Sequence, residues 1–477
     1  MLFNSLSYLA FLVIAIGLLS ALRNHALLVL TVLSCLFYSL WRPEYLILVV
    51  AVSFLDYNLA LAIERSVNDR RRMLFLWISI AANIGVLVAF KYSFFFLDNM
   101  YPVLSALGIR FDLGVFRFIL PLGISFYTFE AISYTVDVYR RVYAAEQRFL
   151  KYFCFIVFFP KLIAGPILRA RDLIPQFSNL AAPTGTMVRE GINRILWGLF
   201  LKVVIADNVA TLVDAGFAIN TATISALDNL TLAFLFGFQI YLDFSSYSSI
   251  AIGSALMMGL TLKENFDFPY LATSPRDFWR RWHISLSEWV RDYIYIPLSN
   301  RFTRSGALLE GRKEVAANVA LVITWTIMGL WHGANWTFVL WGVMHATYLL
   351  GYRFVRPLGE RLTERMVALS GTLITTFLAM VAWIPFRAES LADAGARLAT
   401  LTDPSKYTFL GLRENSYVVA ALLLLGFWAF AFVMKVLAAK TVPLWARYAY
   451  YVLVGFAIIP LTLAFLKPVK QFIYFQF

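Results

Sequence analysis

Apolar runs long enough to cross a lipid bilayer recur along the whole sequence, and they constrain the fold more than any other feature. A helix needs about 20 predominantly apolar residues to span the hydrocarbon core. Hydrophobic residues make up 61% of the 477 residues and charged residues only 14%, which excludes an ordinary soluble domain. We therefore predict an all-α, polytopic integral membrane protein with roughly 11 to 13 helices, re-entrant segments included. The candidate runs lie near 5–22, 26–41, 44–63, 73–97, 116–136, 150–168, 192–216, 229–259, 316–331, 334–354, 369–386, 417–437 and 447–466.

The polar connections between these runs are short, so the sequence predicts a single membrane domain over 1–477. The longest polar stretch, 263–315, is expected to lie at the membrane interface or to re-enter it. The first apolar run lacks a basic start and an Ala-x-Ala-like cleavage site, which favours a retained helix. Cys35 and Cys154 both lie in apolar runs, so we expect neither a disulfide nor a metal site.

The net charge of +13 is best explained by the placement of loops. Basic residues gather in the third loop, which holds Arg65 and Arg70 to Arg72, and around the fifth, which holds Arg140, Arg141, Arg148 and Lys151. Odd-numbered loops share one side, and basic loops stay in the cytoplasm, so the N-terminus is predicted to be extracytoplasmic. Such loops attract anionic lipid headgroups and the phosphates of a nucleotide-like cosubstrate; a nucleic-acid partner is not expected.

His332 closes the apolar run that ends in Gly329-Leu-Trp-His-Gly-Ala-Asn-Trp336, in a chain with only four histidines. An ionisable side chain at membrane depth is expensive, and it normally faces a cavity or a substrate path. Histidine can also move protons near neutral pH. His332 is therefore the first candidate for a base inside the membrane.

The segment 274–298 carries the densest chemistry. Ser274, Pro275 and Asp277 predict a capped helix start, and aromatic and apolar residues then recur every three or four positions up to Tyr293. The pattern predicts one amphipathic, basic helix with His283 at the edge of its apolar stripe. His283 is either a structural histidine of an interfacial helix or a group that lines a cavity.

Two further polar groups lie in apolar surroundings. Asp243 stands in a run otherwise rich in serines and tyrosines, and a carboxylate there needs a partner, whereas Ser245 to Ser249 are expected to join helices by hydrogen bonds. His345 lies in the middle of the next apolar run. It either pairs with a neighbouring helix or positions a substrate.

Nucleotide-loop, dinucleotide, zinc and nucleophile-elbow motifs do not occur in the sequence. Two classes of function therefore remain: an enzyme that uses histidine as a base without a cofactor, and a transporter. Acyl transfer suits the first option, because a neutral imidazole can deprotonate an acceptor hydroxyl as it attacks a thioester. A proton-coupled transporter or flippase with intramembrane His and Asp is the alternative.

Four sequence blocks resemble the membrane-bound O-acyltransferase (MBOAT) family, and within it the bacterial alginate O-acetyltransferase group. They cover about 120–350 in the family's order: Leu120-Pro-Leu-Gly-Ile-Ser-Phe-Tyr-Thr-Phe129; Phe158-Phe-Pro-Lys-Leu-Ile-Ala-Gly-Pro-Ile167; the stretch from Glu264 to Pro297, which contains Phe278-Trp-Arg-Arg-Trp-His-Ile-Ser-Leu-Ser287; and Gly329 to Trp336.

The resemblance implies a helical shell around a central tunnel, with His332 as the catalytic base and His283 as the second family histidine. It implies acetyl-CoA as a cytoplasmic cosubstrate, with no permanently bound cofactor. The acetyl group would modify an exopolysaccharide, directly or through an extracytoplasmic acyltransferase, at a bacterial inner membrane. Trp331, Trp336 and Trp282 would line or brace the reaction chamber. Asn335, Asp243 and His345 are weaker substrate-binding candidates, and Arg280, Arg281 and Arg291 are candidates for the coenzyme phosphates.

The sequence departs from that group at two places. Ser246 and Ser249 replace a glycine and an acidic residue, and Ser299-Asn300 replaces paired glycines. Neither change affects His283 or His332, so the expected acyl-transfer chemistry is the same. The identity of the polysaccharide stays open, and it is either alginate-like or cellulose-like. D-alanyl transfer from a carrier thioester is the second enzymatic alternative.

Overall fold

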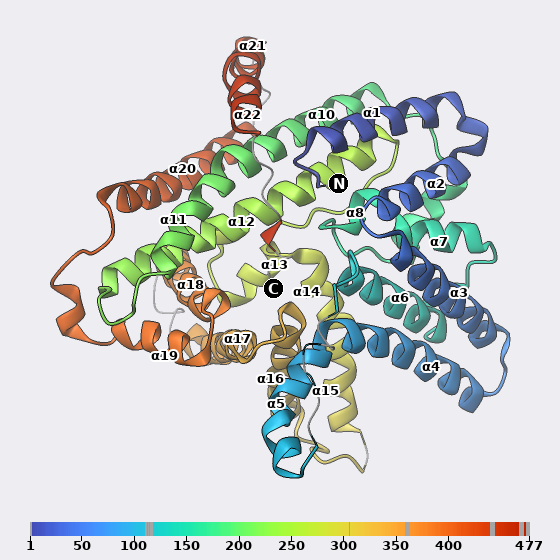
Figure 1. Ribbon diagram of the computed structural model, residues 1–477, viewed down its shortest axis with the longest axis horizontal. Coiled ribbons are helices and arrows are strands. Elements are labelled where there is room, and N and C mark those ends of the chain that lie inside the picture. The colour runs from blue at the N-terminus through green and yellow to red at the C-terminus, as the bar shows by residue number, and fades with distance from the viewer. Residues whose placement is uncertain are drawn as a thin grey trace. The chain divides into compact units, whose positions relative to one another are not determined.

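The computed structural model is built from helices, which confirms the all-α prediction (Figure 1). It describes residues 2–109, 112, 114, 118–304, 306–357, 363–438, 444–466 and 472–473, and these ranges contain no β-strand. The chain forms two compact units, each discontinuous in sequence. Unit 1 comprises Met1–Ile195 and Tyr247–Glu264, and unit 2 comprises Leu196–Ser246 and Asn265–Phe477. The single domain predicted over 1–477 stays a prediction.

The helices of the first half run from α1 to α12, and α10 and α12 each contribute to both units. Their bounds are α1 Leu6–Ala21, α2 Ala26–Ser39, α3 Pro43–Arg65, α4 Asp69–Leu87, α5 Ser93–Ala106, α6 Ile124–Tyr139, α7 Phe149–Val157, α8 Phe159–Leu162, α9 Ala170–Leu173, α10 Gly185–Phe200, α11 Asp207–Phe217 and α12 Ala226–Met257.

The second half belongs to unit 2. Its helices are α13 Pro275–Arg281, α14 Ile284–Val290, α15 Ile296–Thr303, α16 Lys313–His332, α17 Trp336–Val355, α18 Glu364–Arg387, α19 Leu391–Thr400, α20 Glu414–Ala438, α21 Leu444–Leu453 and α22 Ile459–Phe465. Single π-helical turns, Leu201–Ala206 and Arg291–Tyr295 among them, link several of these helices.

Six helical segments in the described ranges are long and apolar enough to cross a membrane: Pro43–Arg65, Asp69–Ala106, Gly185–Phe217, Lys313–His332, Met366–Arg387 and Glu414–Val433. The helices over Leu6–Ala21 and Arg23–Ser39 are bent by 101° and bring the number to seven if they count as one span. The protein is therefore polytopic, as predicted. The predicted 11 to 13 helices included re-entrant segments, and several apolar runs fold as helices too short to cross a membrane; the run 150–168, for example, contains α7 with nine residues and α8 with four.

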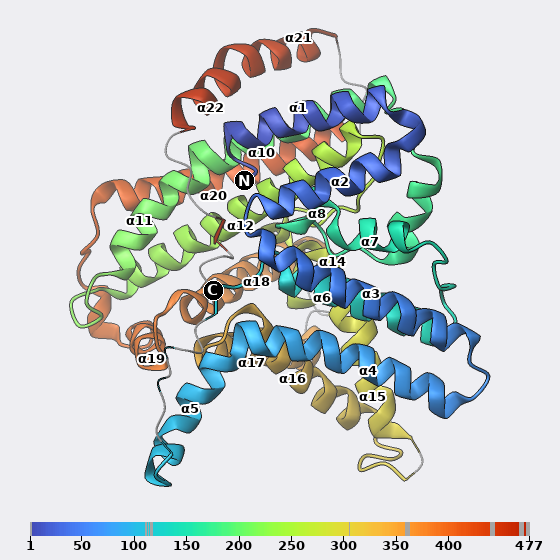
Figure 2. The ribbon, with the colours of Figure 1, turned by 45° about the vertical axis from the view of Figure 1, so that its right-hand side comes forward.

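Unit 1 encloses polar side chains at membrane depth. Helices α3, α4 and α6 lie side by side (Figure 2), and Asp56 of α3 accepts hydrogen bonds from Ser79 (2.6 Å) and Asn83 (2.8 Å) of α4. Arg72 of α4 donates to the carbonyl of Tyr139 at 2.6 Å. Within this unit, the basic loop between α3 and α4 therefore lies beside the end of α6. The loop that follows α6 is also basic, and this proximity is expected if the two loops share one side of the membrane.

Unit 2 is organised around the hairpin of α16 and α17. Two glycines face each other across this hairpin, because a Cβ at Gly329 would collide with the carbonyl of Phe338, and one at Gly342 with the carbonyl of Trp325. Helices α13 and α18 pack against α17. The close approach of α16 and α17 fixes the side chains of both helices relative to each other.

Candidate active site

His332 is the last residue of α16, and aromatic rings surround its imidazole. The ring centroids of Trp331 and Trp341 each lie 4.9 Å from that of His332, and that of Phe386 lies 5.4 Å away. The side chain is 3% exposed. The structure thus places this histidine in an apolar box built by α16, α17 and α18, which we call the His332 box.

The residues that follow His332 have structural roles, in packing and in helix capping, that the sequence did not predict. A Cβ at Gly333 would collide with the ring of Phe338, so only glycine fits directly after the histidine. Asn335 caps α17 by accepting a hydrogen bond from the backbone N–H of Thr337 at 3.1 Å. Trp336 is half exposed, whereas Trp331 is buried. Of the two tryptophans predicted near His332, Trp331 therefore belongs to the box, while half of Trp336 faces outward.

His345 lies in the middle of α17, in a second aromatic cluster. Its ring centroid is 4.8 Å from that of Trp341 and 5.4 Å from that of Trp325. The indole N–H of Trp279 on α13 donates to its Nδ1 at 3.3 Å. Because Nδ1 accepts, the neutral ring carries its proton on Nε2. The structure shows the pairing of this histidine with a neighbouring helix, while a task in positioning the substrate stays a prediction.

His283 interrupts the helix that the sequence predicted as continuous. Helix α13 ends at Arg281 and α14 begins at Ile284, and His283 itself adopts a left-handed backbone with φ of 42°. The prediction of one unbroken stripe up to Tyr293 was therefore wrong. The break follows from backbone pairing with a distant segment, since the Ile284 N–H donates to the carbonyl of Asn265 at 2.9 Å.

Asn265 also determines the tautomer of His283. Its Oδ1 accepts from the backbone N–H of Ser285 at 3.3 Å and lies 3.1 Å from Nδ1 of His283. Because a backbone N–H can only donate, this atom is the amide oxygen, and His283 donates to it. Nδ1 is therefore protonated, and Nε2 is the basic nitrogen. Burial of the fully enclosed ring, which lies outside the six spanning segments, lowers the pKa of His283 to about 3.

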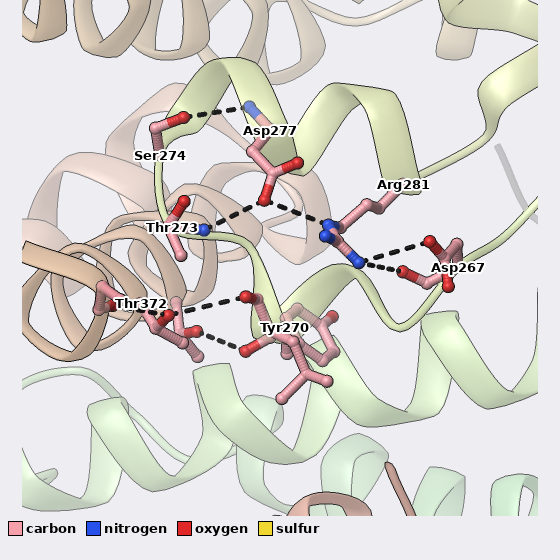
Figure 3. Close-up of polar contacts among 10 residues, drawn as sticks. Asp267, Tyr270, Thr273, Ser274, Asp277, Arg281 and Thr372 are labelled. Atoms are coloured by element: carbon pink, nitrogen blue, oxygen red, sulfur yellow. Dashed lines mark hydrogen bonds and ion pairs between the residues drawn. The ribbon is translucent and has the colours of Figure 1, made fainter. Parts of the chain in front are cut away.

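The remaining polar contacts of this segment hold it in place (Figure 3). Ser274 caps α13 by accepting from the N–H of Asp277 at 3.1 Å, which confirms the predicted helix start. The carboxylate of Asp277 accepts from Arg281 at 3.0 Å, and Arg281 also reaches Asp267 at 3.3 Å. Arg281 is thus engaged in two ion pairs beside the helix break.

A row of indoles connects the helix break with the His332 box. The ring centroid of Trp282 is 4.9 Å from that of Trp383, which lies 6.0 Å from that of Trp341. Trp341 in turn packs against His332. Trp282 is buried, and the structure places it between the two histidine segments, as a bracing residue of the chamber would be.

Asp243 finds the partner that its burial requires. Its carboxylate lies 2.8 Å from the ammonium of Lys202 and accepts a hydrogen bond from the backbone N–H of Ile473 at 3.0 Å. Lys202 also pairs with Asp207 at 2.9 Å. This arrangement links α12 to the C-terminal segment, which favours a structural task over substrate binding.

A cavity of about 430 Å³ opens in unit 2 beside α16 and α17. Four exposed arginines line it, while its buried lining comes mainly from α13 and α16. The arginines are Arg276, Arg291, Arg353 and Arg356, and the buried lining includes Trp279, Thr324, Trp325 and Met328. Arg291 also pairs with Asp292 at 2.8 Å. The described lining residues themselves include no carboxylate, so this arginine-rimmed cavity has a positive mouth.

Of the three predicted phosphate ligands, Arg291 lines this cavity. Arg281 is held by its ion pairs, and Arg280 is an exposed residue outside the lining. Arg353 and Arg356 were not predicted, although they stand three residues apart at the end of an apolar run. That spacing was a usable signal, because it puts both cations on one helix face.

A family model described as MBOAT, membrane-bound O-acyltransferase family, matches residues 75–387, which include His283, His332, His345 and the residues that line the cavity. The chain belongs to this family, and it is therefore an acyltransferase.

Several known proteins are similar over most of the chain. The probable alginate O-acetylase AlgI of Azotobacter vinelandii is 38% identical over 431 residues, covering 89% of this chain and 83% of that protein. The probable alginate O-acetylase AlgI of Pseudomonas aeruginosa is 37% identical, covering 90% and 81%. A peptidoglycan O-acetyltransferase of Helicobacter pylori is 34% identical, covering 76% and 71%.

Proposed function

We propose that this protein transfers acetyl groups from cytoplasmic acetyl-CoA for the O-acetylation of an exopolysaccharide, with His332 as general base. The observation that carries the proposal is the position of His332 on α16, the helix whose preceding turns line the arginine-rimmed cavity. A donor held in that cavity would lie along the helix that ends in the base. The similarity to proteins named alginate O-acetylase supports the choice of acetyl group and polymer.

The arginine-rimmed cavity is the proposed donor site. Its volume falls within the range of about 300–1,000 Å³ that is typical of small-molecule pockets. Guanidinium groups bind phosphates through paired hydrogen bonds, so the four arginines would hold the phosphates of coenzyme A. The buried lining around Trp279 and Trp325 suits the less polar pantetheine arm.

The proposed reaction needs one base and a thioester. A neutral nitrogen of His332 takes the proton of the acceptor hydroxyl, whose oxygen forms a bond to the thioester carbonyl carbon. The carbon–sulfur bond then breaks, and the coenzyme leaves as a thiol after receiving that proton. The apolar surroundings of His332 exclude water and so disfavour hydrolysis of the thioester.

The basic loops of unit 1 bear on the orientation of the protein in its membrane. Basic residues of unit 1 gather at one end of α3, α4 and α6, which supports a cytoplasmic side there. An extracytoplasmic N-terminus follows when the bent pair of α1 and α2 enters and leaves the membrane on one side and does not cross it as a single span. We propose a bacterial inner membrane, with the acetyl group passing to the polymer or to an extracytoplasmic acyltransferase.

The test uses the full-length protein in detergent or nanodiscs with radiolabelled acetyl-CoA. Wild-type protein should release free coenzyme A when the polymer or an acceptor oligosaccharide is present, and His332→Ala should not. His25→Ala is the matched control, because His25 is exposed and outside the cavity. Unchanged cleavage by His332→Ala would remove the base from the proposal, and cleavage of a D-alanyl carrier thioester in place of acetyl-CoA would replace the donor.

A further inference from the structure

We propose that Thr324 binds the acyl donor, by donating a hydrogen bond from its hydroxyl to the amide of the pantetheine arm that lies farther from the sulfur. This inference rests on the proposed function, because it assumes that the arginine-rimmed cavity holds a thioester of coenzyme A. It adds a residue that positions the part of the coenzyme common to all acyl-CoA donors.

Thr324 is a buried polar residue in the wall of the cavity. It lines the cavity and is 2% exposed. The other buried residues of the described lining carry no hydroxyl; they are Trp279, Val290, Trp325 and Met328. The buried part of this wall, as far as the described residues form it, therefore offers a single hydroxyl to a ligand.

The hydroxyl of Thr324 differs from those of nearby threonines. A threonine inside a helix can donate to the carbonyl four residues earlier. Thr326 of α16 donates in this way to Val322 at 2.9 Å. Thr347 of α17 does the same to Val343, also at 2.9 Å. The hydroxyl of Thr324 has no hydrogen-bond partner within the described part of the chain. Burial of a hydroxyl without a partner is unfavourable, so a ligand that accepts its hydrogen bond is stabilised there.

The distance from Thr324 to His332 matches the position of the farther amide. Thr324, Met328 and His332 stand four residues apart and so share one face of α16. At about 1.5 Å per residue, Thr324 precedes His332 by roughly 12 Å. Eight bonds separate the farther amide nitrogen from the thioester carbonyl carbon, or roughly 9–10 Å when three bonds of an extended chain advance about 3.3–3.6 Å. The nearer amide nitrogen, at roughly 5 Å, would lie beside Met328 instead.

The order of groups along α16 agrees with this placement. Arg353 of α17, which lines the cavity, donates a hydrogen bond to the side chain of Asn318 on α16. Asn318 precedes Thr324 by six residues, roughly 9 Å along the helix. An arginine, the free hydroxyl of Thr324 and the proposed base therefore follow one another along α16, as phosphate, arm and thioester do in the donor.

The test uses thioesters that carry one or both amides, with the full-length protein in nanodiscs. Acetyl-CoA and acetyl-pantetheine carry both amides, whereas S-acetyl-N-acetylcysteamine carries only the nearer one. Thr324→Val should lower kcat/KM with the first two donors by about three- to tenfold, the net effect of one neutral hydrogen bond. It should leave kcat/KM with the truncated donor unchanged. Thr324→Ser, which keeps the hydroxyl, should retain most of the wild-type activity. Free pantetheine gives the same comparison without turnover, since its inhibition constant against acetyl-CoA should rise by the same factor in Thr324→Val.

Thr326→Val is the matched control, because that hydroxyl donates to its own helix and Thr326 does not line the cavity. It should leave kcat/KM unchanged with every donor. An equal loss with the truncated donor in Thr324→Val would show that the residue acts on the structure of the site. No loss with any donor would show that it does not bind the arm. Either result overturns the inference, while wild-type cleavage of acetyl-CoA keeps the proposed function. If Thr324→Val does not fold, Thr324→Ala takes its place with the same readout. Wild-type protein that cleaves none of the thioesters would remove the proposed function, and this inference with it.

Discussion

The two histidine segments of unit 2 are both buried, but they are built in opposite ways. His332 ends a long helix and is surrounded by the rings of Trp331, Trp341 and Phe386. His283 stands at a helix break with a left-handed backbone and donates to Asn265. Aromatic packing positions the first ring, whereas a hydrogen bond and the backbone conformation fix the second.

This difference indicates different tasks. A general base works best when its pKa lies near the operating pH. Burial lowers the pKa of His283 to about 3, so this ring is a poor proton acceptor at neutral pH. It is better suited to act as a fixed, neutral group that accepts a hydrogen bond at Nε2. Within the proposed function, proton transfer therefore belongs to His332, and His283 would act in positioning.

The largest expected effect separates these two tasks. His332→Gln should lower kcat for acetyl transfer by about 10²- to 10⁴-fold, the usual contribution of a general base. His283→Asn should cost no more than about tenfold, because Asn tolerates a left-handed backbone and its amide can still donate to Asn265. Equal losses in the two variants, measured on folded protein, would break the comparison.

The second effect tests whether the packing of α16 against α17 positions His332. Gly342→Ala places a methyl group against the carbonyl of Trp325, so α16 and α17 must separate. Overpacking of this kind destabilises a protein by about 1–3 kcal/mol. We expect a lower midpoint of thermal unfolding and a lower kcat. Gly351→Ala on the same helix is the control, because nothing lies within 4 Å of its added Cβ; an equal decrease there would contradict the packing argument.

Local signals in the sequence predicted part of this site well. The capped start of α13 at Ser274 followed from residues that contact one another within one turn. The apolar run before His332 predicted a membrane helix, and α16 is long and apolar enough to be one. In both cases the information lies within a few residues of the feature.

The features that were not predicted depend on distant segments. The break at His283 is produced by pairing with Asn265, which lies 18 residues away, and neither glycine nor proline marks it locally. The cavity gathers arginines from α13 and from the end of α17, which only tertiary packing brings together. The ion pair of Asp243 with Lys202 could not be predicted either, because Lys202 belongs to another helical segment.

A third, smaller effect concerns the pH dependence of stability. Burial depresses the pKa of His283 from 6.5 to about 3, so between these values the unfolded chain binds a proton that the folded chain does not. The contribution of the neutral ring to the stability of the folded protein is fully present above pH 6.5, and it is lost progressively as the pH falls towards 3. The thermal midpoint of wild-type protein should therefore fall more steeply between about pH 7 and about pH 5 than that of His283→Asn. Parallel curves would show that the ring is not held neutral.

The smallest expected effect concerns the arginines that line the arginine-rimmed cavity. Exposed charge pairs contribute about 0.2–1 kcal/mol each, so Arg276→Ala or Arg353→Ala should raise the KM for acetyl-CoA by no more than about fivefold. The kcat should change little, because in the proposed function these arginines hold the phosphates of the donor and His332 takes the proton. Arg280→Ala is the matched control, since Arg280 is exposed on the same helix as Arg276 but does not line the cavity. An equal rise in KM for Arg280→Ala would mean that general positive charge attracts the donor. A change in kcat at the rim would mean that donor binding and proton transfer are not separated along α16.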